Sequence, residues 1–222
     1  MPGNFKTNPV LENIRRALGR EPGMSAGERP GVLPPRVPGD AEAEIDLLLS
    51  EIIRLSGEAR RVAGDEIEAA LQSLVREQGV QRATLWPTAR LAELGVEDCL
   101  RRLGVEIISP HAGKQSLASC DLGVTEADFA LPETGTLALF SSPEKPRAVS
   151  LLPRVHLAVV HPEALRADLH PIFAEARQHN YMILITGPSR TSDIELTTTL
   201  GVHGPKALYV WVLKRPSSRS KT

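Results

Sequence analysis

The chain has 222 residues, of which 41% are hydrophobic and 24% are charged, and its net charge is −1. This composition is typical of a soluble globular protein with one sizeable domain and an appendage, and it excludes a chain that is disordered throughout. The apolar runs are far shorter than the roughly 18 residues that span a bilayer, which excludes a membrane protein. The balanced charge gives no global attraction for nucleic acid.

The two ends of the chain differ from its middle. Residues 9–18 have the apolar spacing of a short helix, and residues 19–40 carry five Gly and five Pro without an apolar period. Residues 1–39 are therefore interpreted as an N-terminal helix on a flexible arm, through which an oligomer could form. Residues 214–222 are expected to be a basic disordered tail. The N-terminal segment lacks the apolar core of a signal peptide, so a cytoplasmic location is expected.

Helices and strands are predicted from about residue 40 onward. Asp40 is a candidate N-cap for a helix that ends at Gly57, and Asp65 for one that ends at Gly79. Further helices are predicted at 96–103 and 163–179, and strands at 83–86, 105–108, 155–160, 181–186 and 207–213.

The apolar strands predict the fold class. The runs 155–160 and 181–186 are nearly continuous in apolar residues, as expected for strands covered on both faces. With the helix between them they predict a right-handed parallel crossover. The runs 122–126 and 136–140 are joined by a turn-rich segment and are interpreted as a hairpin. Residues 40–213 are thus expected to form a three-layer α/β/α domain with a mostly parallel sheet and an antiparallel excursion.

The first candidate site is the polar segment that follows the strand predicted at 181–186. Ligands of open α/β sheets bind beyond the carboxyl ends of strands, and this segment is expected at such a place. Gly187 allows a close backbone approach, and Arg190 suits a carboxylate or phosphate. The candidate ligand-binding residues are Gly187, Ser189, Arg190, Thr191, Asp193 and Glu195. The alternative is an ordinary strand-to-helix loop in which Arg190 pairs with Asp193 or Glu195.

The second candidate is the segment Leu131–Thr136. Glu133 stands next to a Gly turn, where backbone N–H groups could hold its carboxylate ready as a base or nucleophile. Thr134, Gly135 and Thr136 are the candidate ligand-binding residues beside it. The alternative is a hairpin turn with a solvated glutamate.

The histidines supply one further candidate and no metal site. His203 lies between two glycines in a rigid loop and is a candidate acid or base, with Gly204 beside it, although it could simply bond the backbone. His156 and His161 are five residues apart on a predicted strand, so they should point to opposite faces and make a poor metal pair.

Four blocks of the sequence carry a family resemblance. The blocks are residues 120–130, 131–136, 187–195 and 200–205. Together they resemble the lactate utilization (LUD) domain family over residues 40–213, in particular its shorter members of the lactate utilization protein C (LutC/YkgG) type. The resemblance implies a fold related to the isomerase and CoA-transferase group (NagB/RpiA). It also implies a role with two iron–sulfur partner proteins in oxidising L-lactate to pyruvate.

The cysteine count bears on that role. The chain has two cysteines, whereas an iron–sulfur cluster normally takes four thiolates. No cofactor is therefore expected in this chain, and the clusters are expected on the partners.

Three functions remain open. In the first, the chain is a non-redox subunit that organises its partners or binds lactate or another small carboxylate, with Arg190 clamping the carboxylate and His203 taking the hydroxyl proton. In the second, it is a stand-alone acyl-transfer, CoA or phosphate-ligand enzyme that uses Glu133, because residues 131–139 resemble the Glu-Asn-Gly block of CoA transferases, with Thr134 in place of Asn. In the third, it is a regulatory or scaffold protein with an inactive pocket.

Overall fold

A computed structural model of the chain describes residues 9–20, 36–192, 198–201 and 203–214. It separates two units, Met1–Pro34 and Pro35–Thr222. The first unit contains helix α1 (Pro9–Ala17), which agrees with the predicted helix and leaves its apolar residues exposed. Within the described residues, no helix is both long enough and apolar enough to cross a bilayer.

The second unit is built on a six-stranded sheet in which every neighbouring pair of strands is parallel. The strands, in spatial order, are β1 (Glu58–Val62), β11 (Ala207–Leu213), β7 (Val155–Val160), β4 (Leu122–Glu126), β2 (Arg82–Leu85) and β3 (Glu106–Ile107). Every residue of β7 is buried, as its continuous apolar run predicts for a strand covered on both faces. We call this the main sheet.

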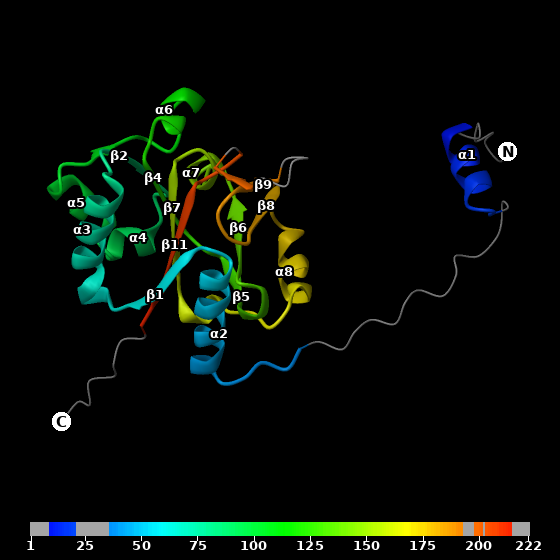
Figure 1. Cartoon of the computed structure of the whole chain (residues 1–222), viewed down its shortest axis with the longest axis horizontal. Helices are drawn as coiled ribbons and strands as arrows, with labels where there is room; N and C mark the ends of the chain where they lie inside the picture. Colours follow the sequence, from blue (N-terminus) through cyan, green and yellow to red (C-terminus); the bar gives the residue numbers. More distant parts are fainter. Residues whose placement is uncertain (1–8, 21–35, 193–197, 202, 215–222) are drawn as a thin grey trace. The chain divides into compact units, whose positions relative to one another are not determined.

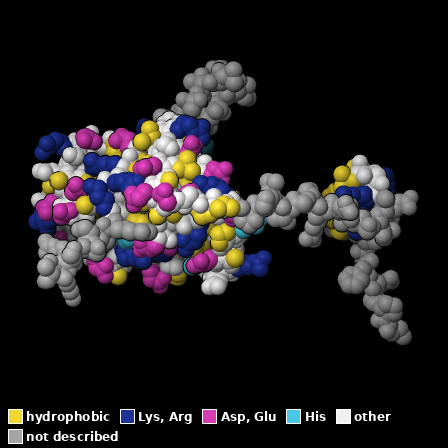
Figure 2. All heavy atoms as spheres, turned by 90° about the horizontal axis from the view of Figure 1, so that it is seen from below, with side chains coloured by type: hydrophobic (Ala, Val, Ile, Leu, Met, Phe, Trp, Pro, Cys, Tyr) yellow, Lys and Arg dark blue, Asp and Glu magenta, His cyan; other side chains and the backbone are white. Residues whose placement is uncertain are grey.

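Helices lie on both sides of the main sheet (Figure 1). The helices are α2 (Ala41–Arg54), α3 (Ile67–Gln78), α4 (Ala89–Glu93), α5 (Val96–Arg102), α6 (Lys114–Ala118), α7 (Ala148–Leu151) and α8 (Leu169–Ala176). Figure 1 shows α3 and α5 on one side of the strands, and α2 and α8 on the other. Seen from below, basic and acidic side chains are interspersed over the body (Figure 2), in keeping with the near-zero net charge.

A small antiparallel sheet lies on the α2 side of the main sheet. It joins β5 (Phe129–Leu131), β6 (Thr136–Ser141) and β8 (Tyr181–Ile185), with β6 in the centre. Helix α8 packs on it through an apolar cluster that includes Phe129, Phe140 and Ile172. The fold class is therefore confirmed: an α/β domain with a mostly parallel sheet and an antiparallel excursion.

The hairpin predicted between residues 122–126 and 136–140 is wrong. Strand β4 pairs with β2 and β7 in the main sheet, whereas β6 pairs with β5 and β8. The hairpin partner of β6 is the three-residue strand β5, which the sequence did not reveal. An apolar run predicts that a strand is buried, but it carries no information on which neighbour it joins.

The parallel crossover predicted through residues 155–186 is also wrong. Strand β8 runs antiparallel to β6 in the small sheet, and its residues Tyr181 and Leu184 are exposed. The helix between β7 and β8 is shorter than predicted, because Leu165 forms a β-bridge with Ala130 and Asp168 caps α8 by accepting a hydrogen bond from the N–H of His170.

One of the two predicted N-caps is present. Asp40 caps α2 by accepting a hydrogen bond from the N–H of Ala43 at 2.8 Å. Asp65 does not cap α3: it lies in the 3-10 turn η1 (Gly64–Glu66), where the neighbouring Glu66 carboxylate accepts from the N–H of Ala63 at 2.8 Å. The carboxylate of Glu66, rather than that of Asp65, therefore caps this turn.

Candidate functional site

Four of the predicted site residues line one cavity. Gly187, Ser189, His203 and Gly204 belong to its wall, together with His156, and its volume is about 160 Å³. The cavity lies between β8 and the first residues of β7 and β11, and we call it the loop cavity. It sits at the amino ends of the parallel strands, so the expectation that this segment follows the carboxyl end of a parallel strand is wrong. The reason is that β8 belongs to the small sheet.

The two loops of this cavity are bonded to each other. The N–H of Ser189 donates to the carbonyl of Pro205, and the N–H of Gly201 donates to the carbonyl of Ser189, both at 3.0 Å. A Cβ on Gly204 would lie 3.1 Å from the Cβ of Ser189. Gly187 has φ +95°, and a Cβ there would lie 2.9 Å from the carbonyl oxygen of Leu55. These glycines allow the loops to close against each other and against the end of α2.

Arg190 follows Ser189 in the chain but does not itself line the loop cavity. Its Nη2 donates a hydrogen bond to the carbonyl of Leu55, the C-cap of α2, and lies 3.6 Å from the position of a Cβ on Gly187. The strand β9 (Arg190–Ser192) follows and pairs with β10 (Thr198–Leu200), so the alternative of a strand-to-helix loop is wrong. Asp193 and Glu195 lie outside the described residues, as does the side chain of Thr191.

His156 is the functional candidate that the sequence did not single out. Its side chain is 1% exposed, its Nε2 lies 2.9 Å from the Oγ1 of Thr125, and its Nδ1 has no hydrogen-bond partner. Burial lowers the pKa of His156 from 6.5 to about 3, so the imidazole is neutral at physiological pH. The sequence offered it only as half of a poor metal pair with His161, and the fold shows that it borders a cavity.

Glu133 lies beside a second, larger cavity. It belongs to the 3-10 turn η2 (Pro132–Thr134), its side chain is 65% exposed, and its Oε2 lies 3.8 Å from the Nε of Arg36. This cavity of about 450 Å³ is lined by Glu133, Thr134 and Thr136 among others, and we call it the Glu133 cavity. Gly135 has φ +60°, and a Cβ there would lie 3.0 Å from the backbone of α2.

A chain of hydroxyl groups connects the two cavities. The Oγ1 of Thr134 donates a hydrogen bond to the Oγ1 of Thr136 at 2.8 Å. The Oγ1 of Thr136 in turn lies 2.8 Å from the Oγ1 of Thr186. Thr186 lines both cavities. The two segments that the sequence offered as separate candidates are therefore neighbours in the structure.

Charged residues gather at the opposite edge of the main sheet. A cavity of about 400 Å³, which we call the edge cavity, lies at the carboxyl ends of β4 and β7 and is lined by Glu126, Asp128 and Arg166 among others. The sequence did not point to these residues, although Glu126 and Asp128 stand at and just after the end of a buried parallel strand, which is itself a signal. Lys145 Nζ lies 2.6 Å from Asp128, and Arg90 lies 3.3 Å from Glu163.

Glu126 is a largely buried carboxylate of the edge cavity. Its Oε1 lies 3.0 Å from the Nε2 of His161, and both side chains are largely buried. Burial by itself raises the pKa of Glu126, but hydrogen bonds from His161 and Thr88 and the charge of Arg90 outweigh it and hold the pKa below its usual value. Glu126 is therefore ionised and already paired.

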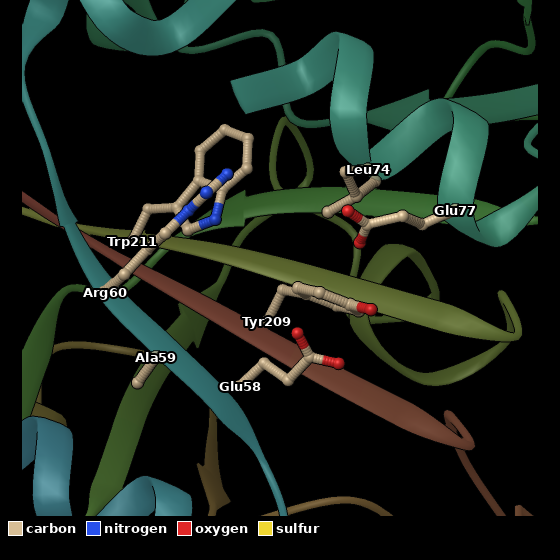
Figure 3. Close-up of a pocket in the computed structure, with 7 residues that line it drawn as sticks. All are labelled: Glu58, Ala59, Arg60, Leu74, Glu77, Tyr209 and Trp211. Carbon is tan, nitrogen blue, oxygen red and sulfur yellow. The ribbon is translucent and has the colours of Figure 1, made fainter. Parts of the chain in front are cut away.

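A further cavity of about 150 Å³ lies over β1 and β11 (Figure 3). Figure 3 shows the carboxylates of Glu58 and Glu77 turned toward the hydroxyl of Tyr209, and the guanidinium of Arg60 stacked over Trp211 at 5.2 Å. Burial and the hydrogen bond with Glu58 raise the pKa of Tyr209 to about 12. No predicted site residue lines this cavity.

The two cysteines are both buried. Burial raises the pKa of the Cys99 thiol and of the Cys120 thiol. Among the residues that the structure describes, no three His, Cys, Asp or Glu side chains are grouped so that they could hold a metal ion.

The fold and its cavities define an α/β domain with candidate ligand sites at the amino ends and at the carboxyl ends of the strands of a parallel sheet. The LUD domain family model matches residues 48–213, and the chain belongs to the LUD domain family.

Relatives of this chain carry a lactate name. It is 31% identical to lactate utilization protein C of Shouchella clausii over 179 residues. The aligned region covers 76% of this chain and 78% of that protein. It is 32% identical to the uncharacterized protein YkgG of Escherichia coli, over 90% of this chain and 95% of that protein. The crystal structure of a DUF162 family protein from Deinococcus radiodurans matches 80% of this chain and all of that chain, with a TM-score of 0.59 and 21% identity, which supports the fold.

Proposed function

We propose that this protein works in lactate utilization, in the cytoplasm, as a subunit without a redox centre of its own that binds a small carboxylate in the loop cavity. The name shared by several relatives supports the process. The convergence of the predicted residues Gly187, Ser189, His203 and Gly204 on one cavity supports the site.

The observation that carries the choice of cavity is the unpaired Nδ1 of His156. Buried polar groups in folded proteins nearly always have a partner, so a buried nitrogen without one at a cavity wall favours a ligand there. In the edge cavity, by contrast, Glu126, Asp128 and Glu163 already have basic partners.

The size of the loop cavity suits a small acid. An apolar cavity of about 150 Å³ accommodates benzene, a ring of six heavy atoms. Lactate and pyruvate also have six heavy atoms, and the loop cavity has a volume of about 160 Å³. A small 2-hydroxy or 2-oxo acid therefore matches this space.

Two residues have assigned roles in this proposal. The Arg190 guanidinium lies near Gly187, which lines the loop cavity, and in this proposal it turns from the Leu55 carbonyl to clamp the carboxylate. His203 is exposed, lines the loop cavity and accepts the hydroxyl proton of the bound acid. Oxidation of lactate to pyruvate also releases the hydrogen of carbon 2 as a proton, which passes to solvent water, and two electrons. Since the chain has only two cysteines, we propose that the electrons pass to two partner proteins that hold the iron–sulfur clusters.

Titration calorimetry tests the binding. The full chain is titrated with L-lactate and with pyruvate, alone and together with co-purified partners. Saturable binding that weakens about tenfold or more in Arg190→Gln is expected, since hydrogen bonds to charged groups are the strong ones. Arg101→Gln, an exposed arginine paired with Glu97 on α5, is the matched control and should bind as the wild type does. Absence of binding under every condition would refute the carboxylate site.

A second candidate function has one observation in its favour. Glu133 lines the Glu133 cavity of about 450 Å³, which is large enough for part of a larger ligand such as an acyl-CoA or a phosphorylated compound. If Glu133 forms an acyl intermediate, mass analysis after incubation with acyl-CoA will show an adduct that Glu133→Gln lacks. Stable capture of the iron–sulfur partners, with neither adduct nor carboxylate binding, would favour the scaffold alternative.

A further inference from the structure

We infer that His156 recognises the oxygen on carbon 2 of the bound acid, so that the loop cavity selects 2-hydroxy and 2-oxo carboxylates over simple carboxylates. This inference rests on the proposed function and adds to it a residue that determines specificity.

The starting point is a row of three positions across the main sheet, two of which carry polar side chains. Thr84 on β2, Gly123 on β4 and His156 on β7 are in register on adjacent parallel strands, so their side-chain positions share one face. Within the described residues, the buried side-chain nitrogen and oxygen atoms that lack a partner are the Oγ1 of Thr84 and the Nδ1 of His156. Two such atoms in one row distinguish this part of the core.

The ring of His156 is held in place on one side. Its Nε2 lies 2.9 Å from the Oγ1 of Thr125, two residues after Gly123 on β4. The backbone of α7 closes the face at Gly123, because a Cβ there would overlap the carbonyl oxygen of Val149 and lie 2.9 Å from Pro153 Cγ. His156 itself lines the loop cavity, and we assign a ligand in that cavity as the partner of its unpaired Nδ1.

The chemistry of a neutral imidazole fits both members of a hydroxy-acid and keto-acid pair. When the Thr125 hydroxyl donates to Nε2, the proton of the ring sits on Nδ1, which can donate to a keto oxygen. When Nε2 carries the proton and donates to Thr125, Nδ1 accepts a hydrogen bond from the hydroxyl of the bound acid, which turns to His203 only when it gives up its proton. The change of tautomer keeps the ring uncharged, as its complete burial requires, and lets one residue bind substrate and product alike.

The contrast with propionate follows from this geometry. Propionate has the carboxylate and the carbon chain of lactate but no oxygen on carbon 2. Its binding would leave the Nδ1 of His156 buried and unpaired, whereas lactate and pyruvate would satisfy it. A site built to bond a substrate oxygen rejects an analogue that lacks it.

Calorimetric titration of the full chain with L-lactate, pyruvate and propionate tests the inference. In the wild type, lactate and pyruvate are expected to bind at least about fivefold more tightly than propionate, the effect of one neutral hydrogen bond. His156→Phe should lose this preference while its affinity for propionate changes by less than about twofold. Thr84→Val, which alters the other unpaired group of the row but does not line the loop cavity, should retain the preference.

A measurement on the wild type covers the case in which His156→Phe does not fold. The ring nitrogen shifts of His156 in nitrogen-15 NMR should report Nδ1 protonated with pyruvate and Nε2 protonated with lactate, and should not respond in this way to propionate. Equal affinity for all three acids, or nitrogen shifts that do not distinguish them, would overturn the role of His156 and leave the carboxylate site intact. Binding of none of the three would overturn the proposed function and this inference with it.

Discussion

The Nε2 of His156 lies 2.9 Å from the Oγ1 of Thr125, and this contact joins the side chains of two neighbouring strands in a fully buried part of the main sheet. Since burial lowers the pKa of His156 from 6.5 to about 3, the unfolded chain binds more protons than the folded one between these pH values. The contribution of His156 to stability is therefore complete above about pH 6.5 and is lost as the pH falls through this window.

Acid denaturation should reveal this histidine. We expect the free energy of unfolding of the wild type to fall between pH 6.5 and pH 3 more steeply than that of His156→Gln. Urea unfolding at a series of pH values measures the difference. His170→Gln changes an exposed histidine on α8 and should keep the wild-type slope. If His156→Gln also keeps that slope, His156 is not the buried neutral group described above.

Gly123 should tolerate no side chain. A Cβ at this position would overlap the carbonyl oxygen of Val149, so Gly123→Ala must displace α7 from β4, and we expect a loss of about 3 kcal/mol or more in stability. Gly64→Ala is the matched control, because a Cβ there meets nothing within 4 Å and the cost should stay within about 0.5 kcal/mol. Thermal and urea unfolding of both variants check the contrast, and equal stability would contradict the packing of α7.

The two aspartates that the sequence offered as helix caps should behave differently. Asp40→Ala removes the hydrogen bond to the N–H of Ala43 and should cost about 1 kcal/mol. Asp65→Ala removes no cap and should leave the stability within about 0.5 kcal/mol. Urea unfolding compares the pair directly, and a larger effect at Asp65 would restore the original prediction.

The pair of Glu126 and His161 should stabilise the carboxyl edge of the main sheet. Glu126→Gln replaces a largely buried ionised group that accepts hydrogen bonds from His161 and Thr88, and we expect a loss of about 1–3 kcal/mol at pH 7. Because the pKa of Glu126 is lowered, its contribution is present above the usual glutamate value of 4.5 and disappears as the pH falls below it. Glu97→Gln is the control: it changes an exposed glutamate that pairs with Arg101, and its cost in stability should be no more than about 0.5 kcal/mol. Similar losses of stability in both variants would show that the burial of the Glu126–His161 pair adds nothing to its contribution.

Tyr209 should ionise at unusually high pH. Its pKa is raised to about 12 by burial and by the hydrogen bond with Glu58, so its phenolate absorbance should develop about two pH units above the usual value of 10.0. Tyr209→Phe identifies the signal in a near-ultraviolet titration, and Glu58→Gln should move it to lower pH. In the folded chain the proton is held more tightly, so this group lowers the stability as the pH rises from 10 toward 12.

The sequence predicted the strands and helices far better than it predicted their pairing. The apolar runs of residues 155–160 and 207–213 predict strands, and both are interior strands of the main sheet. The run at 181–186 has similar composition, yet β8 lies in the small sheet with Leu184 43% exposed. Composition shows that a segment is suited to a strand, whereas partner and direction depend on contacts between distant parts of the chain.

The same limit applies to the candidate site. The glycines and hydroxyl residues around Gly187 and His203 stood out locally, and the fold brings them together. His156 and Glu126 did not stand out, because a histidine within an apolar strand and a glutamate at its end are ordinary features until the neighbouring strands are known. The placement of the loop cavity at the amino edge followed from the antiparallel pairing of β8, which local sequence patterns do not encode.

The burial of Cys99 and Cys120 has a practical consequence for following the association of this protein with others. Both thiols are covered and have raised pKa values, so they are slow to react with maleimide reagents at neutral pH. A single cysteine introduced at the exposed Phe173 on α8 would then take up a fluorescent dye almost alone, without removal of either native residue. The native cysteines can therefore remain in place when the protein is labelled at one introduced cysteine.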